Sequence, residues 1–280
     1  YGDLDTFIRS DMKDNHEIPL IKRFSETKLS EKEFLSLIEC SRKNNFGVMV
    51  TPFDEKSVDK AVEHNVDYLK IASCSFGDWP LMEKISRANK KVVASCAGAD
   101  DKTVDNVVSF FLNRNVPFRL QHCVGEYPTS DEKLNVGQVD FLRKKYPELQ
   151  IGFSSHEDPS SEKIAPLALA IGATSFEKHV AVETENISKN AYSTSPEQFR
   201  KWLESIDDAY KIIGIRDKRY LSSPKESESL RKLQRGIFAL NNLDSNTLIK
   251  KDNIYFAFPP SENQLTANDF SKYTKFTLLN

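Results

Sequence analysis

Six short apolar runs alternate with stretches of helical hydrophobic spacing, and this alternation restricts the fold more than any other feature of the sequence. The runs lie at residues 46–50, 68–71, 91–94, 118–122, 150–156 and 174–179. Strands joined by helical crossovers pair in parallel, so we predict an α/β fold with one parallel sheet. Six such units fit a doubly wound sheet or most of a (β/α)8 barrel. Because no G-x-G-x-x-G motif follows any run, we favour a (β/α)8 TIM barrel.

Local signals outside these runs predict further elements and three segments along the chain. Residues 1–28 show no clear period, so we predict a long loop there. Ser30 and Glu33 form a capping box, and Ser195 followed by Pro196 marks the start of a later helix. We expect a barrel domain over residues 1–215, a charged linker over 216–232 and a small β-rich domain over 233–280.

Composition excludes several classes of protein. The chain has 280 residues with 39% hydrophobic and 29% charged side chains, which argues against disorder. Its net charge of −2 predicts no nucleic-acid surface, and no apolar run reaches the ~20 residues of a membrane span. The four cysteines lack the paired spacing of metal ligands and suit reduced thiols in a cytoplasmic protein. Without a methionine or signal peptide at Tyr1, we expect further sequence upstream.

Two predicted strands end in histidines. His156 and His179 close the runs at 150–156 and 174–179, and residues 161–172 between them suffice for one crossover helix. Such a unit brings both strand ends to the same edge of a sheet. Two imidazoles there can share a divalent metal, with water or substrate completing the coordination. The alternative is two unrelated histidines, one capping a helix and one packed in a loop.

Hydroxyl and amine groups also collect at the expected strand ends, where parallel folds place their chemistry. Hydroxyls and one lysine are the donors that a phosphate monoester needs. Lys70 ends an apolar strand; it can instead form an ion pair at the barrel rim or, less readily, a Schiff base. Each serine can alternatively be a simple strand-end cap. The residues are Thr51, Lys70, Ser73, Ser95 and Ser154.

Other polar residues near the strand ends have weaker signals. Lys178 precedes His179, so its side chain is predicted to point to the opposite face of the strand, whereas Glu177 shares the His179 face. Glu177 is then either a support for the metal site or a buried acid of the barrel core. We expect His122 to be a satisfied interior histidine and His64 to face solvent.

Several motifs resemble the sialic acid synthase family. They are TPFDEKSVD at 51–59, YLKIASCS at 68–75, HCVGEYPT at 122–129, GFSSHED at 152–158, FEKHV at 176–180 and NAYSTSPEQF at 190–199. The stretch from QRGIFAL to KYTKF resembles the antifreeze-like domain of that family, so the resemblance covers nearly the whole chain. The family's first two β–α units, which end in a K-x-Q pattern, would lie before Tyr1.

The resemblance implies a (β/α)8 barrel that condenses phosphoenolpyruvate with an open-chain N-acetylated amino sugar such as N-acetylmannosamine. The product would be a nine-carbon 2-keto-3-deoxy sugar acid, formed with release of phosphate and with Mn2+ or Mg2+ required. A homodimer with exchanged C-terminal domains is also implied. The implied residues are Lys70, Ser73, Ser95 and Ser154 for phosphoenolpyruvate, His156 and His179 for the metal, and Tyr127 near the sugar.

The chain departs from the family pattern chiefly at positions on the sugar side. Ser75 replaces a glutamate of the family, and Ser155 replaces the aspartate of the S-D-H motif. Lys189 replaces a second aspartate and Phe258 an arginine. Gly125 replaces an asparagine or serine. We therefore expect the same donor with a different acceptor sugar, and Glu126, Glu157 or an upstream segment as the missing carboxylate. The alternatives are a class I aldolase using Lys70 and a non-catalytic ligand-binding or partner-binding relative.

Overall fold

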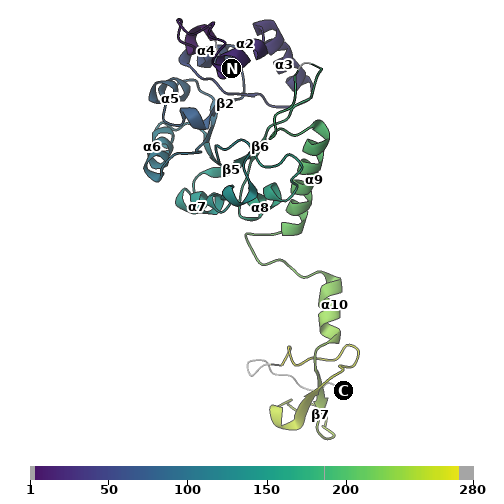
Figure 1. Cartoon of the computed structure of the whole chain (residues 1–280). Helices are drawn as coiled ribbons and strands as arrows, with labels where there is room; N and C mark the ends of the chain where they lie inside the picture. The colour runs from purple at the N-terminus through teal and green to yellow at the C-terminus, as the bar shows by residue number, and fades with distance from the viewer. Residues whose placement is uncertain (1–3, 186, 271–280) are drawn as a thin grey trace. The chain divides into compact units, whose positions relative to one another are not determined.

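The structure is a computed structural model that describes residues 4–185 and 187–270. It consists of two compact units that divide between Gly214 and Ile215 (Figure 1). Each unit is described by itself below.

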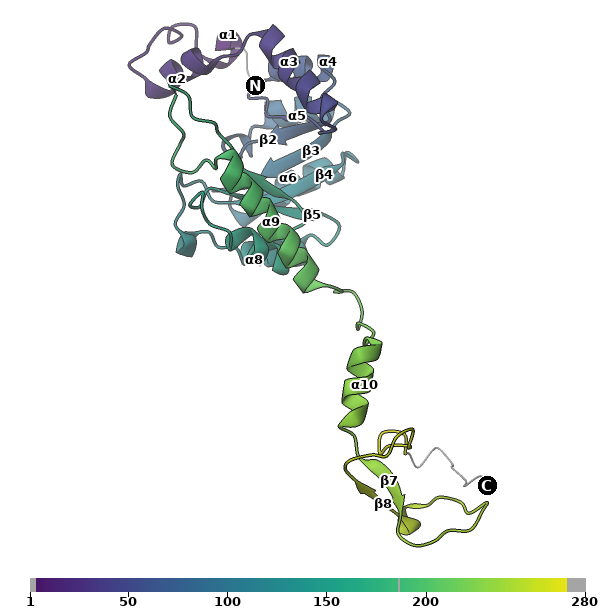
Figure 2. The same ribbon diagram turned by 90° about the vertical axis from the view of Figure 1, so that its right-hand side faces the viewer.

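A six-stranded parallel sheet forms the centre of the first unit. Its strands pair in sequence order, each with the next along the chain. The sheet curls into a half-barrel, which confirms the predicted parallel α/β architecture (Figure 2). In the described residues the sheet has six strands, not the eight of a complete barrel. The strands are β1 (Met49–Val50), β2 (Tyr68–Ile71), β3 (Lys91–Ser95), β4 (Phe118–Cys123), β5 (Gln150–Ser155) and β6 (Phe176–Lys178).

A helix follows each strand, and side-chain caps define where most of these helices begin. Asp54, Asp78, Asp100 and Ser195 each accept a hydrogen bond from the backbone N–H three residues further on. The helices are α4 (Glu55–Glu63), α5 (Trp79–Ser86), α6 (Asp101–Leu112), α7 (Gln138–Lys145), α8 (Ile164–Ala170) and α9 (Pro196–Ile213).

The apolar core lies between these helices and the sheet. Its largest fully buried side chains include Leu69, Phe111, Leu120, Ile151 and Phe153. Burial of each side chain of this size contributes about 1.5–3 kcal/mol to folding. The core therefore fixes the strand positions from which the polar side chains at the strand ends project.

The N-terminal segment differs from the predicted loop. Residues 4–27 include α1 (Leu4–Phe7) and α2 (Pro19–Thr27), and α3 (Glu31–Lys43) follows with the predicted capping box at Ser30. Pro19 occupies the first turn of α2, where its missing N–H has no partner to lose. The Phe24 ring of α2 packs 6.1 Å from that of Phe7, and Phe7 lies 5.5 Å from Phe53. These tertiary contacts stabilise a helix that the sequence period did not reveal.

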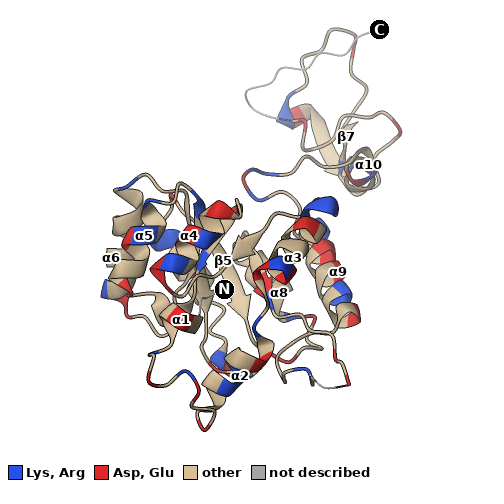
Figure 3. Ribbon diagram, turned by 90° about the horizontal axis from the view of Figure 1, so that it is seen from above, with Lys and Arg blue, Asp and Glu red and all other residues tan. Residues whose placement is uncertain are grey.

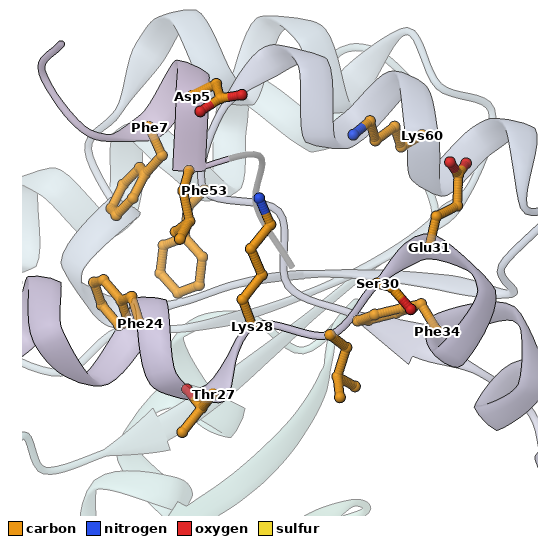
Figure 4. Close-up of a pocket in the computed structure, with 12 residues that line it drawn as sticks. Asp5, Phe7, Phe24, Thr27, Lys28, Ser30, Glu31, Phe34, Phe53 and Lys60 are labelled. Atoms are coloured by element: carbon orange, nitrogen blue, oxygen red, sulfur yellow. The ribbon is translucent and has the colours of Figure 1, made fainter. Parts of the chain in front are cut away.

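A cavity of about 460 Å³ lies beside this aromatic group (Figure 4). Phe7, Phe24 and Phe53 form one wall, and the Lys28 side chain extends between them and Glu31. None of the predicted site residues lines this cavity.

Up to residue 270, the second unit contains one α-helix, a 3₁₀ turn at Lys251–Asn253 and a small antiparallel sheet. α10 (Pro224–Lys232) lies within the expected linker and begins at Ser223, whose side chain accepts the Glu226 N–H. β7 (Gly236–Ala239) pairs with β8 (Ile254–Ala257), as the predicted β-rich domain requires. Gly236 has no room for a side chain, because a Cβ there would lie 3.0 Å from the Pro260 Cα. Residues 271–280 of the predicted domain lie outside the described residues.

Charged residues of both signs are mixed over the surface, and the thiols divide between exposed and buried positions. Basic and acidic residues are interspersed along helices such as α3 and α9 (Figure 3). All four cysteines are free; Cys40 and Cys74 are exposed, whereas Cys96 and Cys123 are buried. Burial raises the pKa of the Cys96 thiol to about 12. In the described part of the chain, none of the helices combines the length and apolar character that crossing a bilayer requires.

Candidate active site

Five neighbouring strands each contribute one polar side chain to a connected network inside the curled sheet. The Lys70 ammonium on β2 donates to Ser95 Oγ on β3 over 2.8 Å, and Ser95 Oγ donates to Gln121 Oε1 on β4 over 3.2 Å. Lys70 Nζ also contacts Glu177 Oε1 on β6 at 3.3 Å, and Ser154 Oγ on β5 donates to the same oxygen at 3.3 Å. Side chains alternate between the faces of a strand, so these five share the concave face.

This network is buried but reaches a cavity. Lys70, Ser95, Gln121 and Ser154 are buried, whereas the Glu177 side chain is 37% exposed. A cavity of about 380 Å³ includes Thr51, Lys70, Gln121 and Glu177 in its lining. Lys70 thus forms an ion pair with Glu177, which was one of the predicted alternatives for this lysine. Its ammonium also borders the cavity, where an anion can reach it.

Ser73 lies at a second, larger cavity, which is lined by residues that follow β2, β3 and β4. It lies in the 3₁₀ turn after β2, and its hydroxyl accepts the Ala97 N–H at 3.3 Å. The cavity measures about 1020 Å³, and Ser73, Cys123, Gly125 and Tyr127 contribute to its lining. The predicted phosphoenolpyruvate residues therefore divide between two cavities, with Lys70 in one and Ser73 in the other.

The two predicted metal-binding histidines lie together. The ring centroids of His156 and His179 are 5.2 Å apart, which excludes the alternative of two unrelated histidines. The Tyr127 ring lies 4.2 Å from His156, and the Tyr192 ring lies 5.0 Å from His179 and 5.9 Å from His156. No separate sequence signal pointed to Tyr192. It reaches the site because Thr194 donates its N–H and its hydroxyl to the His179 carbonyl, each over 2.8 Å.

Both imidazoles are in the neutral protonation state that a metal ligand requires. Burial lowers the pKa of His156 and of His179, and the proximity of His156 lowers that of His179 further, so both rings are neutral at pH 7. His156 Nδ1 lies 3.0 Å from the Val124 carbonyl oxygen, which can only accept a hydrogen bond. The proton therefore resides on Nδ1, and the lone pair of Nε2 remains available.

A divalent cation fits this pair only if other ligands complete its coordination. Among the residues that the structure describes, no three His, Cys, Asp or Glu side chains are grouped so that they could hold a metal ion. Two neutral imidazoles on adjacent strand ends are suitable donors, and substrate or water oxygens would have to supply the other ligands. The residues present therefore fit a cation with an open coordination shell.

Polar residues beside the histidines occupy different environments. The Lys178 side chain lies away from the network, as predicted, and contacts Glu157 Oε1 at 2.9 Å. Both side chains are fully buried, which corrects the suggestion that Glu157 supplies a carboxylate to the site. The exposed Glu126 carboxylate lines the larger cavity and binds Lys133 at 2.9 Å.

Two further histidines give one confirmed and one wrong prediction. His122 is buried and bonds through Nε2 to the Leu134 carbonyl at 2.9 Å, as expected for a satisfied interior histidine. His64 is 9% exposed, not solvent-facing, because Glu31 of α3 covers it and lies 3.3 Å from its Nε2.

Three positions that depart from the family pattern have clear surroundings. Ser75 is buried in the turn after β2, so no carboxylate is present at that point. Lys189 Nζ donates to Gln198 Oε1 at 3.1 Å, next to the start of α9. Phe258, in the second unit, is 62% exposed.

The fold and the site define an α/β protein of the half-barrel type with a connected polar network and a histidine pair near the carboxyl ends of its strands. The chain belongs to the NeuB family, whose model matches residues 5–218. This match includes every strand of the parallel sheet and all residues of the site described above.

Known relatives share both the sequence pattern and the fold. N,N'-diacetyllegionaminic acid synthase of Campylobacter jejuni is 23% identical over 252 residues, which cover 88% of this chain and 73% of the relative. A Chromobacterium violaceum structure, whose name refers to spore coat polysaccharide biosynthesis, is 45% identical with a TM-score of 0.93 over 99% of this chain and 82% of its own. The N-acetylneuraminic acid synthetase of Leptospira borgpetersenii is 29% identical with a TM-score of 0.72, covering 82% and 78%.

Proposed function

We propose that the protein condenses phosphoenolpyruvate with an open-chain N-acetylated amino sugar to give a nine-carbon 2-keto-3-deoxy sugar acid and phosphate. The observation that carries the proposal is the combination of the Lys70 network with the His156–His179 pair at one end of the sheet. Membership of the NeuB family and the sugar-acid synthase names of its relatives support it. Relatives that are named for different sugar-acid products share the fold, so the fold does not select one acceptor. We therefore propose N-acetylmannosamine or a related hexosamine.

We propose a role for each donor of the network. The Lys70 ammonium would bind the phosphate, with the Ser73, Ser95 and Ser154 hydroxyls as further donors that hold the ester in place. Before the donor binds, Glu177 neutralises Lys70, so an arriving phosphate has to replace the 3.3 Å contact between them. Ser95 stays positioned in this exchange because it also donates to Gln121.

The histidines and tyrosines would handle the acceptor. Mn2+ or Mg2+ held by His156 and His179 would polarise the sugar aldehyde as a Lewis acid. The enol carbon would form the new C–C bond with the aldehyde carbon, whose oxygen takes up a proton. Water would add to the carbon that bears the phosphate and lose a proton, and phosphate would leave by cleavage of that C–O bond. Tyr127, which lines the larger cavity, and Tyr192 pack against the histidines and would orient the sugar.

Phosphate release tests the proposal. We expect release to need phosphoenolpyruvate, a hexosamine and a divalent cation together, with a product mass equal to the acceptor plus the three-carbon acid. EDTA should abolish it, as should His156→Ala or His179→Ala, whereas His16→Ala, an exposed change, should not. Release that continues undiminished in EDTA would contradict the proposal.

A ligand-binding role without turnover is the second candidate, and the serine at position 75 favours it. The buried Ser75 hydroxyl replaces a carboxylate that the family resemblance implies. Phosphoenolpyruvate binding in calorimetry with no product from any hexosamine would support this candidate against the first.

We further propose that the second unit is an antifreeze-like domain and that the protein is a cytoplasmic homodimer with exchanged C-terminal domains. The resemblance of residues 233–280 and the antiparallel pair β7–β8 support the domain assignment. Light scattering during gel filtration measures the assembly state; a monomer at micromolar concentration would refute the dimer.

A further inference from the structure

The Glu157–Lys178 contact is the most buried ion pair described in the chain. Both side chains are 0% exposed, and Lys178 Nζ lies 2.9 Å from Glu157 Oε1. In the described structure neither Glu157 oxygen nor the Lys178 ammonium makes an aligned hydrogen bond, so each charge depends on the other. Buried pairs of this kind commonly add little stability, because desolvation cancels most of their attraction.

The position of the pair relates it to the histidines. Glu157 directly follows His156 after β5, and Lys178 is the last residue of β6, directly before His179. The strands are adjacent, with Ser155 opposite Lys178 in the register. Since Glu177 joins the network on the concave face, Lys178 and its partner lie behind the sheet. One buried contact therefore connects the two strand ends that carry the imidazoles.

From this arrangement we infer that Glu157 and Lys178 are positioning residues that hold His156 and His179 at the spacing needed to bind one divalent cation. The inference rests on the proposed function. Removing both charges while keeping side-chain volume breaks this link between the two strand ends, so the residues just beyond the paired strands can shift relative to each other. The histidines then lose their common spacing although neither ligand has changed.

The test compares the full-length protein with E157M/K178M, which replaces both charges by apolar groups of similar length. We expect its unfolding midpoint without metal to equal or exceed that of the unchanged protein. We expect Mn2+ affinity, measured by calorimetry, to fall about tenfold or more, as when supports of metal ligands are lost. Phosphate release should recover when Mn2+ is raised in proportion. E157Q, which leaves the buried ammonium without its partner, should both weaken Mn2+ binding and lower the midpoint.

Two outcomes separate the possible failures. If E157M/K178M binds Mn2+ as tightly as the unchanged protein, the pair is only structural and the inference is wrong. If the unchanged protein binds no Mn2+ at all, the proposed function fails together with the inference. As a matched control, Lys84→Met removes an exposed ion pair with Asp59 and should leave the affinity unaltered.

Discussion

The Lys70 ammonium lies 3.3 Å from the Glu177 carboxylate, although the two residues belong to the second and sixth strands of the sheet. Three strands separate β2 from β6, so their side chains meet only because the sheet curls and turns both toward its concave face. The contact gives the network a counterion that an incoming anion must displace. Lys70 is accordingly the residue whose loss should affect donor binding most directly.

Replacing Lys70 by methionine should lower phosphate release by about 10²–10³-fold, the usual cost of losing one donor to a developing or transferred charge. Mn2+ binding at the histidines should persist in this variant. Steady-state kinetics with varied phosphoenolpyruvate measure the first effect and calorimetry the second. Lys163→Met, at an exposed lysine paired with Asp131, is the control and should have near-normal kinetics.

Acid should destabilise the fold partly through His122. Burial lowers the pKa of His122 in the folded state, so between that value and the ordinary value of about 6.5 the unfolded chain binds the additional proton. Stability contributed by the neutral ring is therefore complete above pH 6.5 and declines as the pH falls below it. His122→Gln keeps a donor for the Leu134 carbonyl but cannot titrate. Urea unfolding at pH 7 and pH 5 should show a smaller loss in the variant; equal losses would exclude His122 as the cause.

Removing the capping box of α3 should cost about 1 kcal/mol. In the structure the Ser30 backbone N–H donates to Glu33 Oε2 at 2.7 Å, and the Glu33 N–H donates to Ser30 Oγ at 3.3 Å. Ser30→Ala removes the second of these bonds, and urea unfolding measures the loss. Ser36→Ala, inside the same exposed helix, should leave stability unchanged or slightly higher. An equal loss in both variants would show that the cap is not responsible.

Gly152 should not tolerate even a methyl group. A Cβ at this position in β5 would lie 2.9 Å from Gln121 Cγ and 3.1 Å from the Ser175 carbonyl oxygen. Gly152→Ala should therefore destabilise the fold by about 1–3 kcal/mol. It should also reduce phosphate release, because Gln121 accepts the Ser95 hydrogen bond. Gly77→Ala, where a Cβ would meet nothing within 4 Å, is the matched control and should be close to neutral.

The features of the fold and site that could be predicted from the sequence are those that depend on residues close together in the chain. Strand runs, caps and the alternation of Glu177 and Lys178 follow from neighbouring residues, so their placement could be predicted. Tyr192 could not be, because a loop returns it to His179 through Thr194. The environment of His64 depends on Glu31 from another helix.

Residues whose role depends only on tertiary contacts could not be recognised from the hydrophobic periodicity of the sequence. Gln121 sits within an apolar strand, and only the pairing of β3 with β4, which sets Gln121 opposite Ser95, shows that it supports Ser95. The helix α2 likewise depends on the packing of Phe24 against Phe7. The eight-stranded barrel and the identity of the second unit remain predictions from the family resemblance.

The unequal exposure of the four free cysteines provides a built-in reporter of folding. A thiol reagent added to the folded protein should label Cys40 and Cys74 quickly, while the buried thiols of Cys96 and Cys123, which border the larger cavity, should react more slowly. Cys96 and Cys123 lie on β3–β4 and their margins, so their labelling rate follows the opening of the sheet. Counting modified sulfurs by mass over time would thus distinguish local breathing of the site from complete unfolding, without an added probe.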